Sequence, residues 1–410
     1  MKNGKIVART IIILILVTVI LTLYIMAGAK YNTMKVAFYG LSENVETVLT
    51  SWLYERNINW QPVVLDPTIP VNEQIQGPVE ENLLFIQDGA NLDTVAPLAR
   101  TAKTSNLMPL TVSLRTSVKT NNRLTATPLL IDHYQMSYNN DKLSELGSAP
   151  PTNLTSLEAL CETFLENRTD ASFSSPIICA GGNDNELSKF FSALLETVTG
   201  IDNYSIAQMT LVENPELFFD LPQVYETLEY IVKLENNGFL SSNWLNISSE
   251  NLINAVENNS PLFAFMPFSS FQALSESAKS TNEVWYMPSG KNRETRYLIA
   301  DIVTVMEFSF VKSPLQSARQ ASVKNELAAS IIKELGSGLT QSNISTETNL
   351  CPVNASAQIE NLQTAETREL LSLADGAIGD LASSTFSTNE QKAQFANQIR
   401  QAIATIRKDF

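Results

Sequence analysis

In the first quarter of the chain, short apolar segments typical of strands alternate with a segment whose apolar residues have the spacing of a helix. Met34–Gly40, Trp60–Asp66 and Asn82–Asp88 are short apolar runs rich in β-branched and aromatic residues, which predicts strands. Glu43–Asn57, between the first two, predicts a helix because its apolar residues recur at helical spacing, at Val45, Val48, Leu49, Trp52 and Leu53. Strands and helices in this order predict a mainly parallel sheet with helices on its faces.

Polar residues follow each predicted strand. In open α/β sheets, ligands bind beyond the carboxyl ends of the strands. Those ends are Tyr39–Ser42, Asp66 and Gln87–Gly89. A single Asp or Gly at such a place is more simply explained as a turn former, but the three together predict the rim of a binding site, with Tyr39, Ser42 and Asp88 as candidate ligand-binding residues.

The middle of the chain changes from an extended to a helical pattern. Thr125–Asn140 reads as an extended crossover, and the sequence DKLSELG after it reads as a short helix. Pro150 and Pro151 cannot continue that helix. A new helix is predicted from Thr155, with Glu158 completing a capping box. Its buried face would be Leu157, Leu160, Cys161, Phe164 and Leu165.

Two later segments show the same amphipathic spacing. In the first, Asp220 and Gln223 are expected to cap a helix that ends at Gly238, with a stripe at Val224, Leu228, Ile231 and Leu234. In the last, Ser387 and Glu390 are expected to form a capping box before a stripe at Phe395, Ile399, Ala402, Ile403 and Ile406. We expect this last helix to dock on the core rather than on a partner.

The N-terminus carries a long apolar segment. Lys2, Lys5 and Arg9 precede the uncharged run Ile11–Ala29, which as a helix would be about 28 Å long, close to the thickness of a bilayer core. Ala27–Ala29 also fits a signal-peptide cleavage site. Residues 1–29 are therefore either a signal peptide or an anchor in the inner or cytoplasmic membrane. Both alternatives predict that the chain from Lys30 onward is extracytoplasmic.

Composition and charge narrow the class of protein. A chain of 410 residues with 44% hydrophobic and 17% charged residues is globular and long enough for two lobes. The net charge of −15 argues against a nucleic-acid partner, because nothing here would neutralise a row of phosphates.

Residues for catalysis or metal binding are scarce. The single histidine, His133, rules out the common His-based triads and metal sites and is expected to be structural. Cys161, Cys179 and Cys351 suit either one disulfide with one free thiol or three buried thiols. We therefore expect no enzyme, no metal and no cofactor.

Several stretches, in order, resemble a known family. Pro128, Tyr138-Asn139, DKLSELG, Pro150-Pro151 and Thr155–Leu160 are followed by FFDLPQVYETLEYIVKLENNGFLSSNW, AVENNSPLFAFMPFSSF, EVWYMPSG and NLCPVNASA. This series, from about Met34 to Ala357, resembles the extracellular solute-binding proteins of the bacterial sugar-binding class, which serve ABC importers.

The resemblance implies a fold, a function and a site. It implies a two-lobed α/β fold of the periplasmic-binding-protein type II, with hinge crossovers and a preceding hydrophobic helix. Lobe 1 would span 30–128 and lobe 2 129–290, with 291–410 returning to lobe 1 and ending in helices. The expected function is capture of a sugar or oligosaccharide in the periplasm or at the cell surface, for an ABC permease. Further candidate ligand-binding residues are Asp132, Tyr134, Asn183, Asp184, Phe268 and Trp285.

The sequence also departs from the family. The Trp expected near Leu154 is absent, and Phe268 or Phe271 replaces the binding-site Trp. Arg296 and Tyr297 stand where the family has Gly-Gly, so the ligand would be small or acidic, or the cleft partly occluded. An occluded cleft would suit the alternative of a membrane-tethered sensor or protein-interaction module that does not transport. An uncleaved anchor and the absence of a lipid-anchoring cysteine near Ala29 favour this alternative, whereas the hinge and the aromatic residues favour transport. An extracytoplasmic enzyme is a third alternative.

Overall fold

The computed structural model describes residues 33–76, 82–103, 114, 119–120, 123–167, 175–290, 297–308 and 318–408. The apolar segment Ile11–Ala29 and Arg296 lie outside these ranges. Within them, no helix combines the length and the apolar character needed to cross a bilayer.

Lobe 1 is built on parallel strands. Strand β1 (Met34–Tyr39) pairs in parallel with β2 (Trp60–Val63) and β3 (Leu83–Gln87), which confirms the three predicted strands. Helix α2 (Glu43–Glu55) follows β1 and buries the five apolar residues that the spacing selects. The other elements are α3 (Val71–Gln74), α4 (Ala90–Val95), the 3-10 helix Ala96–Leu98, β4 (Lys119–Thr120) and β5 (Arg123–Leu124).

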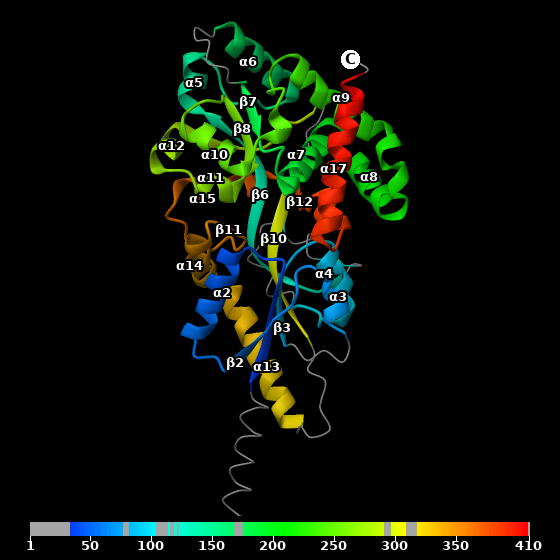
Figure 1. The fold of residues 1–410 in the computed structure, drawn as a ribbon. Coiled ribbons are helices and arrows are strands. Elements are labelled where there is room, and N and C mark those ends of the chain that lie inside the picture. Colours follow the sequence, from blue (N-terminus) through cyan, green and yellow to red (C-terminus); the bar gives the residue numbers. More distant parts are fainter. Residues whose placement is uncertain are drawn as a thin grey trace, which may run out of the picture.

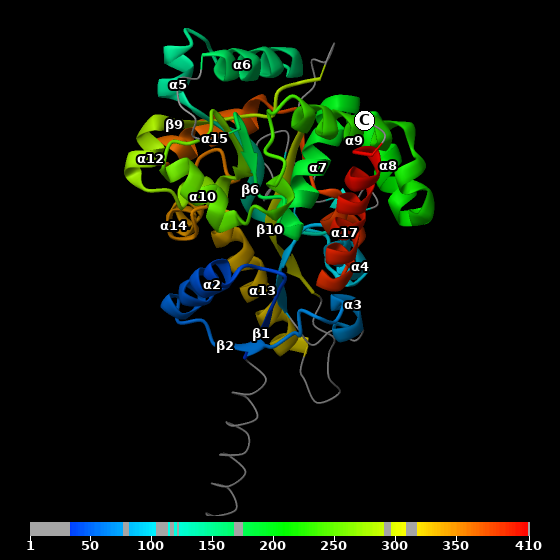
Figure 2. The ribbon, with the colours of Figure 1, turned by 45° about the horizontal axis from the view of Figure 1, so that its top comes forward.

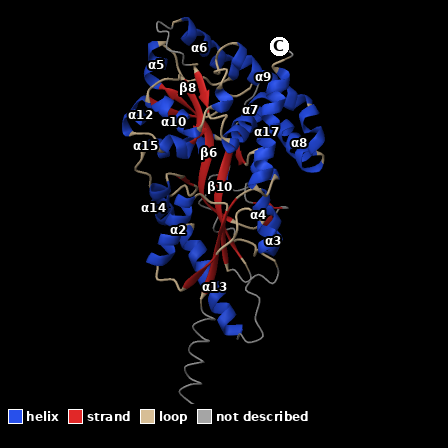
Figure 3. Cartoon of the chain, in the orientation of Figure 1, coloured by secondary structure: helices blue, strands red, loops and turns tan. Residues whose placement is uncertain are grey.

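Helices cover both faces of this sheet (Figure 3). One face packs through Val36, Phe85 and Val303 against α2 and two helices from late in the chain, α13 (Ala318–Leu335) and α14 (Gly338–Thr348). The opposite face packs through Ala37 and Ile86 against α3 and α4.

Two long strands join the lobes (Figure 1). Strand β6 (Thr127–Asn139) carries the chain out of lobe 1, and β10 (Tyr297–Glu307) brings it back. They pair antiparallel, with Asp301 opposite Asp132, and β10 also pairs antiparallel with β3. The prediction of a mainly parallel sheet is therefore wrong for the sheet as a whole, although β7 with β8 and β10 with β12 also pair in parallel. The sheet is mixed because these two crossovers run in opposite directions, and its order is β2-β1-β3-β10-β6-β8-β7.

Lobe 2 surrounds the far half of β6 (Figure 2). Tyr134, Met136 and Tyr138 of β6 enter a large core with Phe263 and Phe265, while Ala264 and Met266 face a second, smaller core. The elements are α5 (Asn140–Glu145), α6 (Leu154–Glu166), β7 (Ile177–Cys179), α7 (Asp184–Thr199), α8 (Ile201–Glu213), the 3-10 helix Pro215–Asp220, α9 (Pro222–Asn236), the 3-10 helix Trp244–Asn246, α10 (Ser249–Glu257), β8 (Phe263–Pro267), α11 (Phe268–Gln272), α12 (Glu276–Thr281) and β9 (Asn282–Trp285).

The last part of the chain crosses between the lobes once more. After α13 and α14, β11 (Cys351–Pro352) pairs with β6 on the lobe 1 side. Helix α15 (Leu362–Leu373) packs on β9, and β12 (Gly376–Ile378) pairs with β10 on the lobe 2 side. Helices α16 (Leu381–Thr385) and α17 (Asn389–Ile406) follow, and α17 packs against α7 and α9, which confirms that the last helix docks on the core.

The predicted helix caps are displaced from the observed ones. The capping box of α6 consists of Asn153 and Ser156, not Thr155 and Glu158, because Asn153 lies at the N-cap and accepts from the Ser156 amide. Glu158 instead pairs with Lys233.

The other two predicted caps are also wrong. The box of α17 is Thr388 with Gln391, one residue beyond Ser387 and Glu390. Helix α9 has no side-chain cap: Leu221 is its N-cap and Pro222 supplies a preset first turn in place of Asp220 and Gln223. Gly238 has a φ of 74°, as the predicted left-handed stop requires.

The cysteines are three buried thiols. Cys161, Cys179 and Cys351 form no disulfide, and all are buried. Burial raises the pKa of each thiol above its ordinary value, so the thiolate, which is the nucleophile and metal ligand, is disfavoured.

Candidate ligand-binding cleft

A cavity of about 460 Å³ lies between the lobes. Lobe 1 contributes the ends of β1 and β3, through Tyr39, Ser42 and Gln87. Lobe 2 contributes Asn185 and Lys189 from the first turns of α7. Asp301 of β10 and parts of α16 and α17 complete the lining. Of the strand ends predicted as a rim, Tyr39–Ser42 and Gln87 line the cavity, and Leu65 and Pro67 line it beside Asp66, whereas Asp66 and Asp88 themselves do not.

Local backbone geometry places the β1 end of this rim. Gly40 has a φ of 69°, in the left-handed region where a side chain is disfavoured, and it turns the chain away from β1. Ser42 then caps α2, its Oγ accepting from the Val45 amide at 3.4 Å. The Tyr39 hydroxyl donates to the Ile69 carbonyl at 2.9 Å. Burial, with the negative charge of Asp66 added, raises the pKa of Tyr39, so it stays a neutral hydroxyl.

The strongest electrostatic feature of the cavity is the ion pair of Lys189 with Asp301. Their side chains are 11% and 20% exposed, so solvent screens the pair only weakly. Burial alone would lower the pKa of Lys189, but the carboxylates of Asp301 and Asp132 raise it above its ordinary value. Lys189 is therefore a fixed cation at the junction of α7 with the hinge strand.

Asp132 lies beside this pair but is held by another element. Its two carboxylate oxygens accept from the Ser269 amide at 2.9 Å and from the Ser269 hydroxyl at 2.6 Å. Burial raises its pKa, which Lys189 and Ser269 partly offset. The carboxylate joins β6 to α11 and supplies negative charge to Lys189.

Asp88 makes a backbone contact at the hinge. Its Oδ1 accepts from the Ile302 amide at 2.7 Å, and its own amide donates to the Ile302 carbonyl at 2.9 Å. Burial raises its pKa well above the ordinary value, and the charges of Asp301, Asp380 and Asp93 add to this. The side chain lies next to Gln87 of the lining and ties β3 to β10.

Asn183 and Asp184 prepare the start of α7. Asn183 is the N-cap, its side chain accepting from the amides of Asn185 and Glu186. Asp184 pairs with Arg400 of α17 at 2.7 Å. The residue of this turn that lines the cavity is Asn185.

The aromatic residues predicted to bind the ligand pack inside lobe 2 and at the hinge. Tyr134 is 1% exposed and donates to the Phe265 carbonyl at 3.0 Å. Phe268 is completely buried and stacks on His133 with ring centroids 5.9 Å apart. Trp285 packs on Tyr286 and against the edge of Tyr138. Tyr297 packs on β12, where a Cβ at Gly376 would lie 2.6 Å from its ring.

The sequence placed Gln87 at a predicted strand end but selected its neighbour Asp88 as the candidate, and Asn185, Lys189 and Asp301 were not among the candidates. Lys189 had a signal: it is a charged residue within the run LSKFF, on a helix whose neighbouring positions are buried. A buried lysine requires a charged partner, but its partner Asp301 is distant in sequence and has no local signature. Asn185 and Gln87 are ordinary amides in sequence and become notable only through their position.

The C-terminal segment closes one wall of the cavity. Ser383, Ser387 and Lys392 line it from α16, α17 and the loop between them. Asn91 of lobe 1 donates to the Ser387 carbonyl at 2.9 Å. Gly89, with a φ of 110°, lies so close to α16 that a Cβ there would collide with the Ser383 carbonyl oxygen. The β3–α4 turn of lobe 1 therefore contacts α16 of lobe 2 directly.

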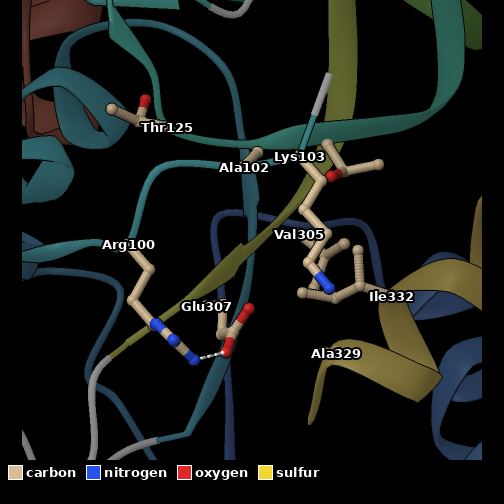
Figure 4. Close-up of a pocket in the computed structure, with 9 residues that line it drawn as sticks. Arg100, Ala102, Lys103, Thr125, Val305, Glu307, Ala329 and Ile332 are labelled. Carbon is tan, nitrogen blue, oxygen red and sulfur yellow. Dashed lines mark hydrogen bonds and ion pairs between the residues drawn. The ribbon is translucent and has the colours of Figure 1, made fainter. Parts of the chain in front are cut away.

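A second cavity, in lobe 1, is far smaller (Figure 4). Arg100 reaches the Glu307 carboxylate on one side of it, and Lys103 and Ile332 lie on the other. Its volume of about 20 Å³ suits a single water molecule. Among the described residues, no group of three or more His, Cys, Asp or Glu is arranged to hold a metal ion. A third hollow, of about 550 Å³, lies on α14 and the segment after β11 and is lined by Ser342, Glu347 and Glu360 among others. It takes no residue from the strand ends or from α7, so the interlobe cavity is the candidate site.

Comparisons with known proteins identify the fold. No family model and no curated protein matches the sequence. Among solved structures, the bacterial solute receptor AcbH, described with an exclusive preference for β-D-galactopyranose, matches with a TM-score of 0.73 at 14% identity, over 92% of this chain and 96% of that one.

Two further structures show the same likeness. A probable secreted solute-binding lipoprotein from Streptomyces coelicolor matches with a TM-score of 0.65 at 13% identity, over 91% of this chain and 98% of that one. Maltose-bound T. maritima MalE3 matches with a TM-score of 0.63 at 16% identity, over 92% and 98%. This chain therefore has the two-lobed, mixed α/β fold of solute-binding proteins.

Proposed function

We propose that this chain is an extracytoplasmic solute-binding protein that captures a sugar or oligosaccharide between its lobes for an ABC importer. The observation that carries the proposal is the interlobe cavity of about 460 Å³ at the carboxyl ends of β1 and β3, where this class of sheet binds ligands. The fold supports it, since the similar structures are described as solute receptors and sugar-bound proteins.

The chemistry of the lining suits a polyol. Sugar hydroxyls both donate and accept hydrogen bonds, so a site needs groups of both kinds. Lys189 supplies a charged donor, Asp301 a charged acceptor, and Gln87 and Asn185 supply amides that do both. Hydrogen bonds to charged groups are worth about 1.5–3 kcal/mol each. Because Lys189 and Asp301 neutralise each other, the site favours a neutral ligand over an acidic one.

The candidates differ in the role that we propose for them. Tyr39 and Ser42 line the cavity and would contact the solute directly. Asp88 and Asp132 would act through the hinge, since their oxygens are bonded to Ile302 and Ser269. Tyr39 and Phe38 are the aromatic residues that we find among the lining residues, so hydrogen bonding would contribute more than stacking.

Hinge motion would couple binding to closure. Strands β6 and β10 both connect the lobes, and a ligand that contacts both sides stabilises the closed arrangement. We propose that Ile11–Ala29 directs the chain out of the cytoplasm or anchors it in the membrane, and that the closed form presents the solute to a permease. The secreted lipoprotein among the similar structures supports this location.

Thermal unfolding of the full chain in the presence of sugars tests the proposal. A ligand that binds only the folded state at about 100 times its Kd stabilises it by about 2.7 kcal/mol. We expect one or more mono- or oligosaccharides to raise the Tm, and Gln87→Ala with Asn185→Ala to lower the affinity at least about tenfold.

A matched amide outside the cavity provides the control. Gln398 is exposed on α17 and does not line the cavity, so Gln398→Ala should leave affinity unchanged. If no sugar of a broad panel shifts the Tm, or if Gln398→Ala weakens binding as much as the double variant, the proposal fails.

A further inference from the structure

Helix α8 in lobe 2 exposes apolar side chains on one face. Ile206, Met209 and Val212 are 50%, 60% and 59% exposed. Three residues advance a helix by about 300°, so successive members lie about 60° apart and share one face. The opposite face is already buried, through Tyr204, Ala207 and Leu211. The exposed side chains are therefore not needed to hold α8 on the core.

Helix α17, which packs on the same lobe 2 core, shows what an ordinary solvated face looks like. Its exposed positions are mostly polar and include Gln394, Asn397, Gln398 and Gln401. Single exposed apolar residues need no explanation. Three on consecutive turns of one face form a contiguous patch, and such patches mark interaction sites.

The charged residues in the stretch of chain that contains α8 have one sign. Between Lys189 and Lys233 the sequence has seven carboxylates and no Lys or Arg. Asp202 and Glu213 are exposed at the two ends of α8, and by helical spacing they lie on the same face as Met209. Glu216 and Asp220 are exposed on the 3-10 helix that packs against α8. The apolar patch thus has a carboxylate at each end.

The charge pattern decides what covers the patch. A second copy of this chain would bring carboxylates against carboxylates, and an anionic membrane surface would be repelled. We propose that the exposed face of α8, made of Ile206, Met209 and Val212 with Asp202 and Glu213, docks a basic amphipathic helix of a partner protein. Its apolar side chains cover the patch, and its Lys and Arg side chains meet the carboxylates.

This surface is separate from the interlobe cavity. Tyr204, on the buried side of α8, donates to the Gly379 carbonyl just before α16 at 2.7 Å. The exposed face points the other way, and none of its residues lines the cavity. Figure 1 shows α8 at the outer edge of lobe 2. Docking there leaves the cavity accessible.

The test uses the full chain and a synthetic amphipathic helix of Leu and Lys, with a scrambled peptide of the same composition. Fluorescence anisotropy should show binding of the amphipathic peptide and at least about tenfold weaker binding of the scrambled one. Ile206→Ser with Met209→Ser should weaken the amphipathic peptide at least about tenfold, as should Glu213→Lys. The Tm should change little, since the altered side chains are exposed.

Glu162→Lys is the matched control. Glu162 is exposed on α6, away from α8 (Figure 1), and its replacement by Lys changes the net charge by the same amount as Glu213→Lys. Equal weakening by Glu162→Lys, or equal binding of the scrambled peptide, would show general attraction to an acidic protein and overturn the proposal. Dimers that Met209→Lys dissociates would identify a second copy as the occupant. Co-sedimentation with phosphatidylglycerol vesicles that depends on Met209 would identify a membrane. Either result also overturns it, and neither depends on sugar binding.

Discussion

The two sides of the cleft are built differently. On the lobe 1 side, polar residues at the ends of parallel strands reach the cavity directly, as Tyr39, Ser42 and Gln87 do. On the lobe 2 side, the aromatic residues expected to contact a sugar fill the core instead, with Phe268 completely buried. The topology of the sheet places strand ends at its edge, where they are exposed. An aromatic side chain, in contrast, is most stable where it buries most apolar surface, which is in the core.

The largest expected effect is that of Phe268→Ala. The ring is fully buried and stacks on His133, so its removal leaves a cavity and should cost about 4 kcal/mol of unfolding free energy. Urea denaturation measures this loss. Phe268→Leu, which keeps most of the volume, should cost less and retain sugar affinity. A loss below about 1 kcal/mol with abolished affinity would place the ring in the cleft and remove the contrast between the two sides.

The pH dependence of stability tests the neighbouring residue. Burial lowers the pKa of His133 from 6.5 to about 4, while the neighbouring side chain of Gln135, whose amide oxygen can accept from a protonated ring, acts in the opposite direction. Between these values the unfolded chain binds a proton that the folded chain does not, so the stability due to His133 is complete above pH 6.5 and falls as the pH drops. The loss reaches about 3 kcal/mol near pH 4.

The measurement compares the unfolding free energy of wild type and His133→Gln from pH 7 to 4. Asp88 and Asp132 contribute with the opposite sign, because burial raises the pKa of each, and the difference between the two proteins cancels them. If the unfolding free energies of the two proteins change with pH in parallel, His133 is solvated, and the hinge beside Phe268 is less tightly packed than the lobe 1 sheet.

The smallest effect is expected at the lobe 1 rim. Ser42→Ala removes the N-cap of α2 and should cost about 1 kcal/mol. Ser248→Ala removes the equivalent cap of α10, which lies away from the cavity, and should cost a similar amount. Titration with the identified sugar should show weaker binding for Ser42→Ala alone. Equal affinities would assign Ser42 to capping only.

The spacing of apolar residues predicts the elements well where that spacing alone determines which side chains are buried. Strands β1 and β3, helix α2 with its five buried residues, and the stripe of α17 lie where the spacing places them. The caps failed where several good capping residues adjoin, as at Asn153, Thr155 and Ser156, because the choice between them depends on where the chain enters the helix.

The site could be predicted only in part, for a different reason. The rim of lobe 1 follows from topology and needs no knowledge of distant residues. Lys189 with Asp301, and Asp132 with Ser269, are contacts between residues far apart in the sequence. Neither contact has a short-range signature, and the same holds for the burial of Phe268. Such features become visible only when the lobes are assembled.

The contact of Gly89 with α16 is one place where the backbones of the two lobes meet without an intervening side chain. Because the missing side chain at this position makes room for a backbone carbonyl of the opposite lobe, any other residue there acts as a wedge. Replacement of this one glycine would force the β3–α4 turn or α16 to shift, and with them Gln87 and Ser383, which line the cavity on either side of the contact.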